Sequence, residues 1–279
     1  MPSNLRPSPP DNGHPQPLPP DLLPDLARDQ RLLLLLDYDG TLSEIAANPA
    51  DARPLEGIKE VLAKLASFSD RLALAIVSGR TIDDVLHFVG TTGGFFYAGN
   101  HGLELMLPDG TRRISPDPHS FAADLDRVRD WIRHNVPDNR GFIAEDKRLS
   151  ITINYRSAHA SDAVSVRDAF EAFIARQAPR LRVLHGKAIV EAIPRGADKG
   201  AAVRKISEIV NNLFTPIYFG DDDTDEYAFR ELAGRGITVL VGEARESAAQ
   251  FRVVEPGEVL FNLRKVAKAL SQRPQGVRE

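Results

Sequence analysis

The sequence contains no cysteine, only two methionines and a single tryptophan. Without cysteine the chain cannot form a disulfide, use a thiolate nucleophile or hold zinc through sulfur. Any catalytic or binding chemistry must therefore use oxygen and nitrogen groups.

The chain also lacks a basic segment followed by an apolar stretch at its start, and no apolar run reaches membrane-spanning length. We therefore expect a cytoplasmic protein with no membrane partner. The formal net charge is −4, and Lys and Arg are scattered rather than grouped. This pattern argues against a nucleic-acid partner and leaves a small molecule in a local cationic pocket as the expected ligand; it says nothing of protein partners.

Hydrophobic residues make up 42% of the 279 residues, enough for a sizeable core. The two ends are the exceptions. Residues 1–27 begin with a proline-rich stretch that has few large apolar side chains, so we predict a disordered leader, with docking of a protein partner as the alternative. Residues 271–279 are predicted to form a flexible tail.

Strand-like and helix-like patterns alternate in the first and the last third of the remaining chain. The first third predicts strands over 32–36 and 72–77 and helices over 58–68 and 82–89. The last third predicts helices over 201–213 and 226–232 and strands over 216–219 and 237–241. This alternation is typical of a doubly wound α/β fold, so we expect residues 28–107 and 194–270 to share one parallel sheet.

The pattern changes between those parts. A turn at 108–110 is followed by helices around 125–132 and 164–174 and by strands around 149–155, 181–184 and 188–193. Apolar residues alternate along 149–155, which predicts a strand with one exposed face. We expect an inserted α+β cap over residues 108–193.

Two acidic clusters follow predicted strands: Asp37-Tyr38-Asp39-Gly40 after the first and Gly220-Asp221-Asp222-Asp223-Thr224-Asp225 after a later one. The carboxyl ends of parallel strands meet at one edge of a sheet, where ligands usually bind. Carboxylates gathered there suit Mg²⁺, which keeps waters that a phosphate can share or replace. The sequence therefore predicts a magnesium-dependent phosphoryl-transfer enzyme.

Other interpretations of these residues exist when each is taken alone. Asp-x-Asp-Gly also begins a calcium-binding EF-hand loop, but Thr41 and Asn48 stand at its fifth and twelfth positions and a strand precedes it. Ser78 could be a helix cap and Lys199 a solvated helix residue. The second acidic cluster could be a helix N-terminus.

The order of four motifs favours the catalytic interpretation. The segment Asp37–Leu42 resembles the first motif of the haloacid dehalogenase (HAD) superfamily of phosphatases, and the segments 77–80, 198–200 and 220–225 follow in that superfamily's order. The resemblance implies a HAD-like core.

The same resemblance implies a role for each motif residue. Asp37 would be the nucleophile and a metal ligand, and Asp39 the acid and base that also offers a backbone carbonyl to the metal. Ser78 and Lys199 would stabilise charge on the phosphoryl group. Asp221 would complete the metal ligands with Asp225, or Asp222, through water or as a further acceptor.

A finer resemblance is to the trehalose-6-phosphate phosphatase family, roughly over residues 30–265. It rests on the segments 98–104, 145–150, 154–156, 186–191 and 194–200, with Asn154 where many relatives carry histidine. It implies that substrate is bound by the side chains of Arg80, Asn100, His101, Glu145, Lys147, Arg156 and Glu191. Among these, Glu145, Lys147 and Glu191 would bind sugar hydroxyls and Arg156 would reach the phosphate from the cap.

The resemblance implies hydrolysis of trehalose 6-phosphate to trehalose and phosphate, through an aspartyl phosphate, in trehalose biosynthesis. One alternative is a phosphatase of the same fold for another ester, such as glucosylglycerol phosphate or sucrose phosphate. Another is a non-catalytic sensor of sugar phosphates. The presence of both Asp37 and Asp39 argues against the sensor, because a binder needs neither a nucleophile nor a proton donor.

Overall fold

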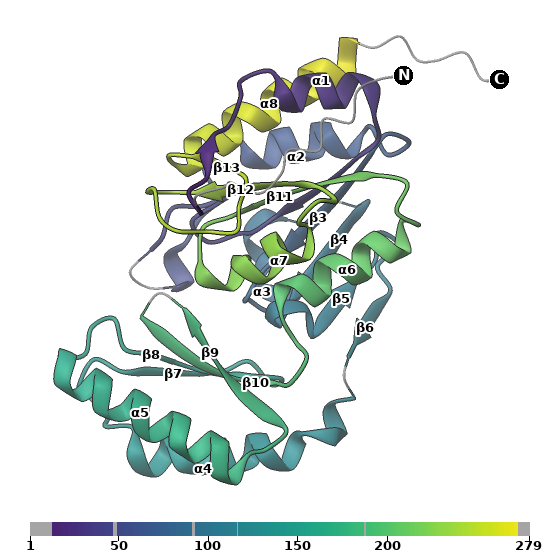
Figure 1. Ribbon diagram of the computed structural model, residues 1–279. Coiled ribbons are helices and arrows are strands. Elements are labelled where there is room, and N and C mark those ends of the chain that lie inside the picture. The colour runs from purple at the N-terminus through teal and green to yellow at the C-terminus, as the bar shows by residue number, and fades with distance from the viewer. Residues whose placement is uncertain (1–12, 47–48, 91–92, 116, 187, 273–279) are drawn as a thin grey trace.

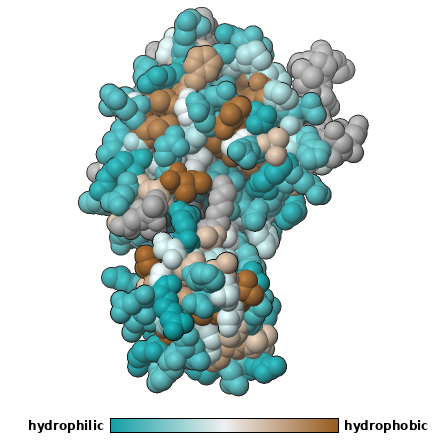
Figure 2. All heavy atoms as spheres, turned by 90° about the vertical axis from the view of Figure 1, so that its left-hand side faces the viewer, coloured by the Kyte–Doolittle hydropathy of each residue, from teal (hydrophilic) through white to brown (hydrophobic). Residues whose placement is uncertain are grey.

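The computed structural model describes residues 13–46, 49–90, 93–115, 117–186 and 188–272. These residues form two bodies, each built on its own sheet (Figure 1). Figure 2 shows them as a larger and a smaller mass that meet at a narrower waist.

The larger body contains a sheet of nine strands within the described residues. In order across the sheet they are β1 (Gln16–Pro17), β13 (Phe251–Val253), β12 (Ile237–Val241), β11 (Thr215–Gly220), β2 (Leu32–Leu36), β3 (Leu72–Val77), β4 (Phe95–Gly99), β5 (Glu104–Met106) and β6 (Arg112–Ile114). Neighbouring strands from β1 to β4 are parallel, and the last two pairings are antiparallel. The predicted parallel α/β sheet is confirmed.

Helices cover both faces of this sheet. One face carries α1 (Leu22–Asp29), α2 (Ile58–Ala66), α3 (Ile82–Val89) and α8 (Pro256–Gln272), and the other carries α6 (Lys199–Ile209) and α7 (Glu226–Glu231). In β2, Leu32, Leu34 and Leu36 pack on the first set and Leu33 and Leu35 on the second. Because both faces of β2 are buried, its sequence is a continuous leucine run rather than an alternating pattern.

The smaller body is an antiparallel sheet covered on one face by two helices. Its strands are β7 (Ile143–Asp146), β8 (Ile151–Asn154), β10 (Ile189–Pro194) and β9 (Leu181–Gly186), in that order. The helices α4 (Ala122–Asn135) and α5 (Ala160–Gln177) bury Val128 and Phe170 against Ile151 and Ile153. The other face of the sheet points toward the larger body (Figure 1).

Four short 3₁₀ turns complete the described elements: η1 (Pro49–Asp51), η2 (Asn100–Gly102), η3 (Pro118–Ser120) and η4 (Asp223–Asp225). Two of them, η2 and η4, follow β4 and β11 at the edge of the larger sheet that faces the smaller body.

The smaller body begins later than the sequence suggests. Residues 104–106 and 112–114 form β5 and β6, which extend the larger sheet by antiparallel pairing, so the turn at 108–110 lies inside the larger body. The expected boundary at residue 108 is therefore displaced past residue 114. A tight turn within one sheet and a turn that leaves a body have similar sequences.

The prediction of a disordered leader over 1–27 is wrong for its second half. Gln16 and Pro17 pair with β13 at the edge of the sheet, and Leu23 and Ala27 of α1 are buried in the core beside α8. Proline is tolerated in an edge strand, which is why a proline-rich segment can join the sheet. Residues 1–12 lie outside the described part, as do 273–279 of the predicted tail, whereas Ser271 and Gln272 belong to α8.

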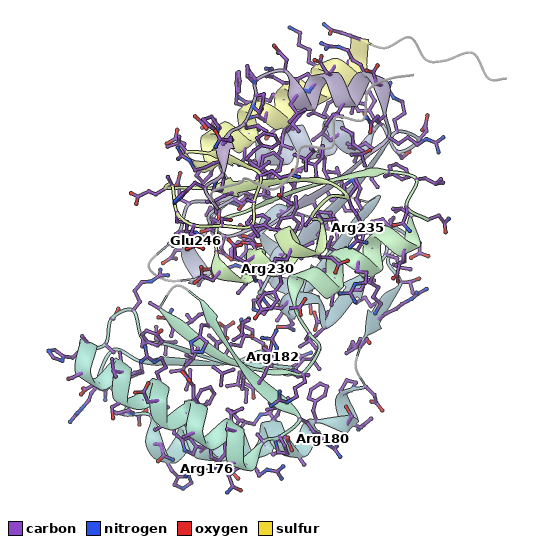
Figure 3. All side chains as sticks on the ribbon, viewed as in Figure 1. Arg176, Arg180, Arg182, Arg230, Arg235 and Glu246 are labelled. Carbon is purple, nitrogen blue, oxygen red and sulfur yellow. The ribbon has the colours of Figure 1, made fainter. Side chains whose placement is uncertain are left out.

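Charged side chains are spread over both bodies. Figure 3 shows Arg176, Arg180 and Arg182 on the smaller body and Arg230 and Arg235 on the larger.

No helix in the described ranges combines the length and the apolar character needed to cross a membrane.

Candidate active site

The carboxyl ends of three adjacent strands, β3, β2 and β11, carry Ser78, Asp37 and Asp221. The backbone N–H of Asp37 donates to the carbonyl of Phe219 (3.0 Å), which continues the β2–β11 ladder into the site. Gly40 follows with φ +74°, and a Cβ there would lie 2.2 Å from Oδ2 of Asp221. Only glycine lets the loop after β2 approach the second acidic cluster this closely.

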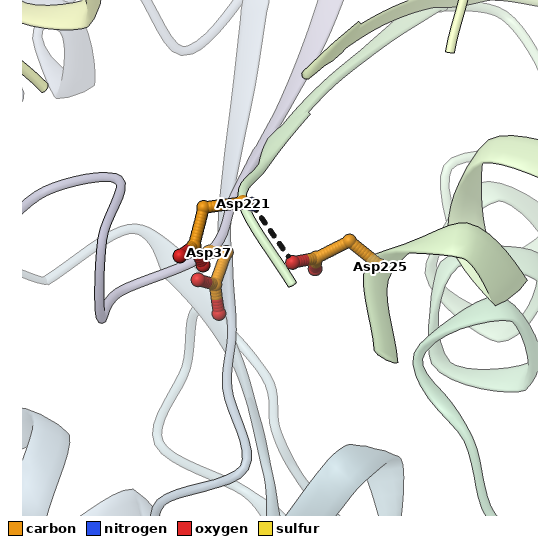
Figure 4. Close-up of side chains that lie close together, drawn as sticks. All are labelled: Asp37, Asp221 and Asp225. Carbon is orange, nitrogen blue, oxygen red and sulfur yellow. Dashed lines mark hydrogen bonds between the residues drawn. The ribbon is translucent and has the colours of Figure 1, made fainter. Parts of the chain in front are cut away.

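Three buried carboxylates form a cluster at this edge. The side chains of Asp37, Asp221 and Asp225 each offer an oxygen within 4.8 Å of the others (Figure 4). Lys199, the first residue of α6, donates from Nζ to Oδ1 of Asp37 and to Oδ1 of Asp225, both at 2.7 Å. Three carboxylates and one ammonium leave two excess negative charges when all are ionised, which suits a divalent cation.

The pKa values reflect this excess of negative charge. Burial raises the pKa of Asp37 well above its ordinary value; Lys199 lowers it, and the carboxylates of Asp225 and Asp221 raise it further. Burial by itself would lower the pKa of Lys199, but Asp225 and Asp37 more than offset this, so that pKa is raised. Lys199 is therefore a permanent cation. A further cation beside Asp37 would favour the charged form of the Asp37 carboxylate.

Asp225 is fully buried and accepts four hydrogen bonds. Oδ1 accepts from Lys199 and from the hydroxyl of Tyr218, each at 2.7 Å, and Oδ2 accepts from the backbone N–H groups of Asp221 (3.0 Å) and Asp222 (2.9 Å). The sequence did not rank Asp222 and Asp225. With four donors on it, the Asp225 carboxylate is a buried support that orients Lys199 and the 221–222 turn.

Asp39 is not part of this cluster and pairs with Arg80. The Arg80 guanidinium donates from Nε to Oδ2 and from Nη2 to Oδ1, both at 2.7 Å, while its Cζ lies 5.5 Å from the Tyr38 ring and 5.1 Å from the Phe88 ring. Asp39 therefore adds no side-chain oxygen to the cluster, so the predicted metal contact of Asp39 rests on its backbone carbonyl. Arg80 was predicted to bind substrate, which stays a prediction; the residue lines the cavity and its guanidinium holds Asp39.

The loop 78–80 is held by a second turn, η2. The backbone N–H groups of Asn100 and His101 donate to the carbonyls of Arg80 (2.7 Å) and Ser78 (3.0 Å). Asn100 and His101 have φ of +48° and +54°, which is uncommon outside glycine and often found at functional sites. Asn100 was also predicted to contact substrate, and this stays a prediction: the residue is completely buried and is not among those that line the cavity between the two bodies.

A cavity of about 190 Å³ lies between the two bodies. Of the predicted site residues, all except Asn100 and Asp225 line it. The lining residues are Asp37, Asp39, Ile45, Ala46, Ser78, Gly79, Arg80, His101, Ile143, Glu145, Lys147, Thr152, Asn154, Arg156, Ile189, Glu191, Lys199, Asp221, Asp222 and Thr224. The structure thus brings the motifs of the larger body and the smaller body to one space.

Charged contacts cross this space. Nζ of Lys147 donates to the carbonyl of Gly79 (3.0 Å) and to both oxygens of Glu191 (3.4 and 3.3 Å), and Nε2 of His101 lies 3.2 Å from Oε2 of Glu191. Glu191 is completely buried. Burial would raise the pKa of Glu191, but Lys147 and then His101 outweigh this and hold that pKa far below its ordinary value.

The other two predicted residues of the smaller body, Glu145 and Arg156, also line the cavity but are exposed. Nη1 of Arg156 donates to the carbonyl of Ala46 (2.9 Å), in the loop that follows the Asp37 motif. Glu145, in β7, is exposed. Arg156 therefore joins the two bodies.

The comparisons with known proteins agree with this geometry. The family model described as trehalose-phosphatase matches residues 35–256. The chain belongs to the trehalose-phosphatase family. It is 32% identical over 251 residues to a protein of Mycolicibacterium paratuberculosis named trehalose-phosphate phosphatase, a match that covers 86% of this chain and 63% of that protein. The chain thus spans less than two thirds of that relative.

Solved structures show the same fold. The C-terminal domain of Candida albicans trehalose-6-phosphate phosphatase has a TM-score of 0.80 at 24% identity, covering 91% of this chain and 98% of that one. A haloacid dehalogenase-like hydrolase from Bacteroides thetaiotaomicron has a TM-score of 0.59 at 17% identity, covering 87% and 99%. The HAD-like fold predicted from the motifs is confirmed, and the family implies a divalent metal at the acidic cluster.

The motifs of the trehalose-phosphatase family did not reveal how the smaller sheet lines the cavity. Two rows of side chains cross β7, β8 and β10 in register. The first row is Glu145, Thr152 and Glu191, and the second is Ile143, Asn154 and Ile189. All six line the cavity. The sequence predicted one exposed face for β8, so Thr152 was overlooked; the signal was its alternation with Ile151 and Ile153.

Proposed function

We propose that the protein hydrolyses trehalose 6-phosphate to trehalose and inorganic phosphate, as part of trehalose biosynthesis. The observation that carries this proposal is a shared cavity: the Asp37–Lys199–Asp221 cluster lies on one wall, and Glu145 and Glu191 lie on the opposite wall. A phosphate ester at the first wall would place its sugar against the second. The names of the relatives support the choice of sugar.

The proposed metal is Mg²⁺. Side-chain oxygens of Asp37 and Asp221 and the backbone carbonyl of Asp39 would hold it, and the excess negative charge of the cluster fits a hard divalent cation. When bound, the ion reduces repulsion between the Asp37 carboxylate and the phosphate and neutralises charge on the phosphoryl oxygens.

Asp37 would attack phosphorus and form an aspartyl phosphate while the bond from phosphorus to the sugar oxygen breaks. Lys199 fixes Oδ1 of Asp37 at 2.7 Å, so Oδ2 is the proposed attacking atom. The Lys199 ammonium and the hydroxyl of Ser78 stabilise charge on the equatorial phosphoryl oxygens. Neither group changes protonation in this step.

Asp39 would donate a proton to the departing sugar oxygen and then take one from the water that hydrolyses the aspartyl phosphate. The hydrolysis breaks the bond between phosphorus and Asp37, releases phosphate and restores the Asp37 carboxylate. The two bonds from Arg80 fix the rotamer of Asp39 in the cavity.

The smaller body, from the end of β6 to the return into α6, is proposed to be a specificity cap. Its carboxylates and Lys147 can form charge-assisted hydrogen bonds with sugar hydroxyls. Because Lys147 also binds the carbonyl of Gly79, closing the cap and shaping the Ser78 loop would occur together. Closure would exclude bulk water from the reacting phosphate.

The proposal is tested by phosphate release from trehalose 6-phosphate, glucose 6-phosphate, sucrose 6-phosphate and glucosylglycerol phosphate, with Mg²⁺ or with EDTA. We expect selective, metal-dependent release from trehalose 6-phosphate by the wild type and at least about a 10³-fold loss in Asp37→Asn, because the neutral amide cannot attack phosphorus.

Two other outcomes would redirect the assignment. Faster release from another ester would retain the phosphatase mechanism and replace the substrate. No release from any ester, with measurable binding of sugar phosphates, would indicate a sensor.

A further inference from the structure

Two residues that line the cavity carry buried polar atoms without a hydrogen-bond partner in the described part of the chain. Oγ1 of Thr152 and Nδ1 of His101 find no partner within the described residues, and each residue is only 4% exposed. Most buried hydroxyls and ring nitrogens in proteins are hydrogen-bonded, so such atoms in a cavity wall point to a ligand.

Thr152 occupies the centre of a polar row. It lies directly opposite Glu145 of β7 and Glu191 of β10 in the antiparallel register. Opposed side chains in such a pairing are about 4.5–5.5 Å apart at Cβ, so one ligand group can reach two of them. The helices α4 and α5 pack on the other face of this sheet, so the hydroxyl must find its partner on the cavity side.

His101 approaches the same row from the larger body. Its Nε2 lies 3.2 Å from Oε2 of Glu191, which leaves Nδ1 for another group. The ring fits because residue 79 is glycine: a Cβ there would lie 2.6 Å from Cε1 of His101. Glu191 therefore has Thr152 beside it on its own sheet and His101 in contact with it from the larger body.

We propose that Thr152, beside Glu191 and His101, is a specificity-determining residue that binds a hydroxyl of the sugar. A sugar hydroxyl can donate to the Glu191 carboxylate while it accepts from Oγ1 of Thr152, and a neighbouring hydroxyl can pair with Nδ1 of His101. A phosphate ester without these hydroxyls leaves the buried groups unpaired and is discriminated against.

This inference rests on the proposed function and deepens it. It assigns recognition of the sugar, rather than of the phosphate, to the neutral hydroxyl of Thr152. This residue lies on β8, between the strands that carry Glu145 and Glu191. The ligand class is a sugar with adjacent hydroxyl groups.

The test compares Thr152→Val, which keeps the β-branched shape and removes the hydroxyl, with Thr152→Ser, which keeps the hydroxyl. For each, kcat/KM is measured on the sugar phosphate that the wild type hydrolyses fastest and on p-nitrophenyl phosphate. We expect Thr152→Val to lower the ratio of the two values by about 3- to 10-fold, mainly through KM, and Thr152→Ser to restore most of it.

Inhibition by the products separates the sugar from the phosphate. The inhibition constant of trehalose should rise by the same factor in Thr152→Val, and that of inorganic phosphate should stay within about twofold. The melting temperature of Thr152→Val should not fall, because no internal hydrogen bond is lost. A lower melting temperature with an unchanged substrate ratio would make Thr152 merely structural and overturn the proposal.

Failure of the proposed function gives a different result. If the wild type hydrolyses no sugar phosphate, the phosphatase assignment falls, and calorimetric binding of trehalose to the wild type and Thr152→Val judges the role of Thr152 separately. Binding that weakens in Thr152→Val supports this role. Equal binding, or no binding to the wild type, overturns it.

Discussion

Single residues in the site act through shared hydrogen bonds. Asp225 ties Lys199, Tyr218 and the 221–222 turn together, so the position of the ammonium beside Asp37 depends on a carboxylate that does not line the cavity. A buried charge held this way is costly to leave unpaired, which fixes its geometry. The geometry around the Asp37 carboxylate therefore depends on Asp225, which does not line the cavity.

Tyr218→Phe removes one of the four hydrogen bonds on Asp225 and little else, since the Tyr218 hydroxyl is buried and donates to it at 2.7 Å. We expect kcat to fall about 3- to 10-fold with KM for the sugar phosphate nearly unchanged, because a hydrogen bond to a carboxylate contributes roughly 1.5–3 kcal/mol and only part of this loss reaches the position of Lys199. Steady-state kinetics checks this. In Tyr227→Phe, where the ring is 37% exposed, kcat should stay within about twofold; equal losses in both variants would contradict the assignment.

Glu191 gives a prediction for stability and pH. Its folded pKa lies below the ordinary value of 4.5, so its contribution to stability is present at neutral pH and is lost as the pH falls toward the folded pKa. Glu191→Gln leaves Lys147 and His101 facing a neutral group. We expect a loss of about 3 kcal/mol in the free energy of unfolding at pH 7, shrinking below pH 4.5, in denaturant titrations.

The matched control is Glu145→Gln, in the same row but exposed. Its free energy of unfolding should change by less than about 1 kcal/mol at any pH. If the loss of unfolding free energy in Glu191→Gln grew at acid pH, the pKa of Glu191 would have to be raised in the folded protein, which would contradict the prediction.

At the scale of elements, the ends of β2 and β11 create the acidic cluster that is proposed to hold the metal. Their parallel register brings Asp37 and Asp221 side by side, although 184 positions separate them in the sequence numbering, 221 minus 37. Their charges repel until a cation is bound. The site is therefore a property of the strand pair rather than of either motif.

Divalent cation binding should stabilise the folded protein. At about 100 times its dissociation constant, Mg²⁺ is expected to add roughly 2.7 kcal/mol to the free energy of unfolding, because it binds the folded state alone. The melting temperature is measured with Mg²⁺ and with EDTA. Asp221→Asn should melt at the same temperature in both; a metal-induced rise that persisted in this variant would place the ion elsewhere.

The pairing of α1 with α8 is a second element-scale feature. Leu23 of α1 is 1% exposed in the core, so Leu23→Ala should destabilise the protein by about 2–5 kcal/mol in denaturant unfolding. Leu213, which is 63% exposed, provides the control: Leu213→Ala should change stability by less than about 0.5 kcal/mol. A Leu23→Ala variant as stable as the control would restore the idea of a disordered leader over these residues.

At the scale of the whole molecule, the two bodies complete one site. Contacts between them include Lys147 with Gly79, His101 with Glu191, and Arg156 with Ala46. A further contact is made by Arg182, which is labelled in Figure 3: its Cζ lies 5.3 Å from the ring of Tyr227 in α7. The smaller body is thus held to the larger body by polar contacts, which are easier to open than an apolar core.

Lys147→Ala should loosen the smaller body and the loop 78–80 together. We expect faster hydrogen exchange at the amides of Arg80, Asn100 and His101, whose N–H groups bond within the 78–80 and 100–101 turns. Lys268→Ala, on an exposed position of α8, is the control and should leave these amides unchanged. Unchanged exchange in Lys147→Ala would show that the contact of Lys147 with Gly79 does not hold the loop 78–80 in place.

The sequence by itself determined the parallel sheet, the acidic motif that begins at Asp37 and the residues that gather at the strand ends. Those features depend on local physical rules: apolar runs bury both faces of a parallel strand, and carboxyl ends of neighbouring strands converge. The strands over 32–36, 72–77 and 237–241 have the predicted bounds for this reason.

Only the tertiary structure decided the partners of individual side chains. Arg80 binds Asp39, Asn100 is buried behind the wall, Asp225 supports Lys199, and Thr152 faces the cavity between two glutamates. These contacts join residues far apart in the sequence, and their geometry depends on strand register and on how the cap sits on the larger body. Local propensities and charge patterns carry no information about either, because both are set by the packing of the whole chain.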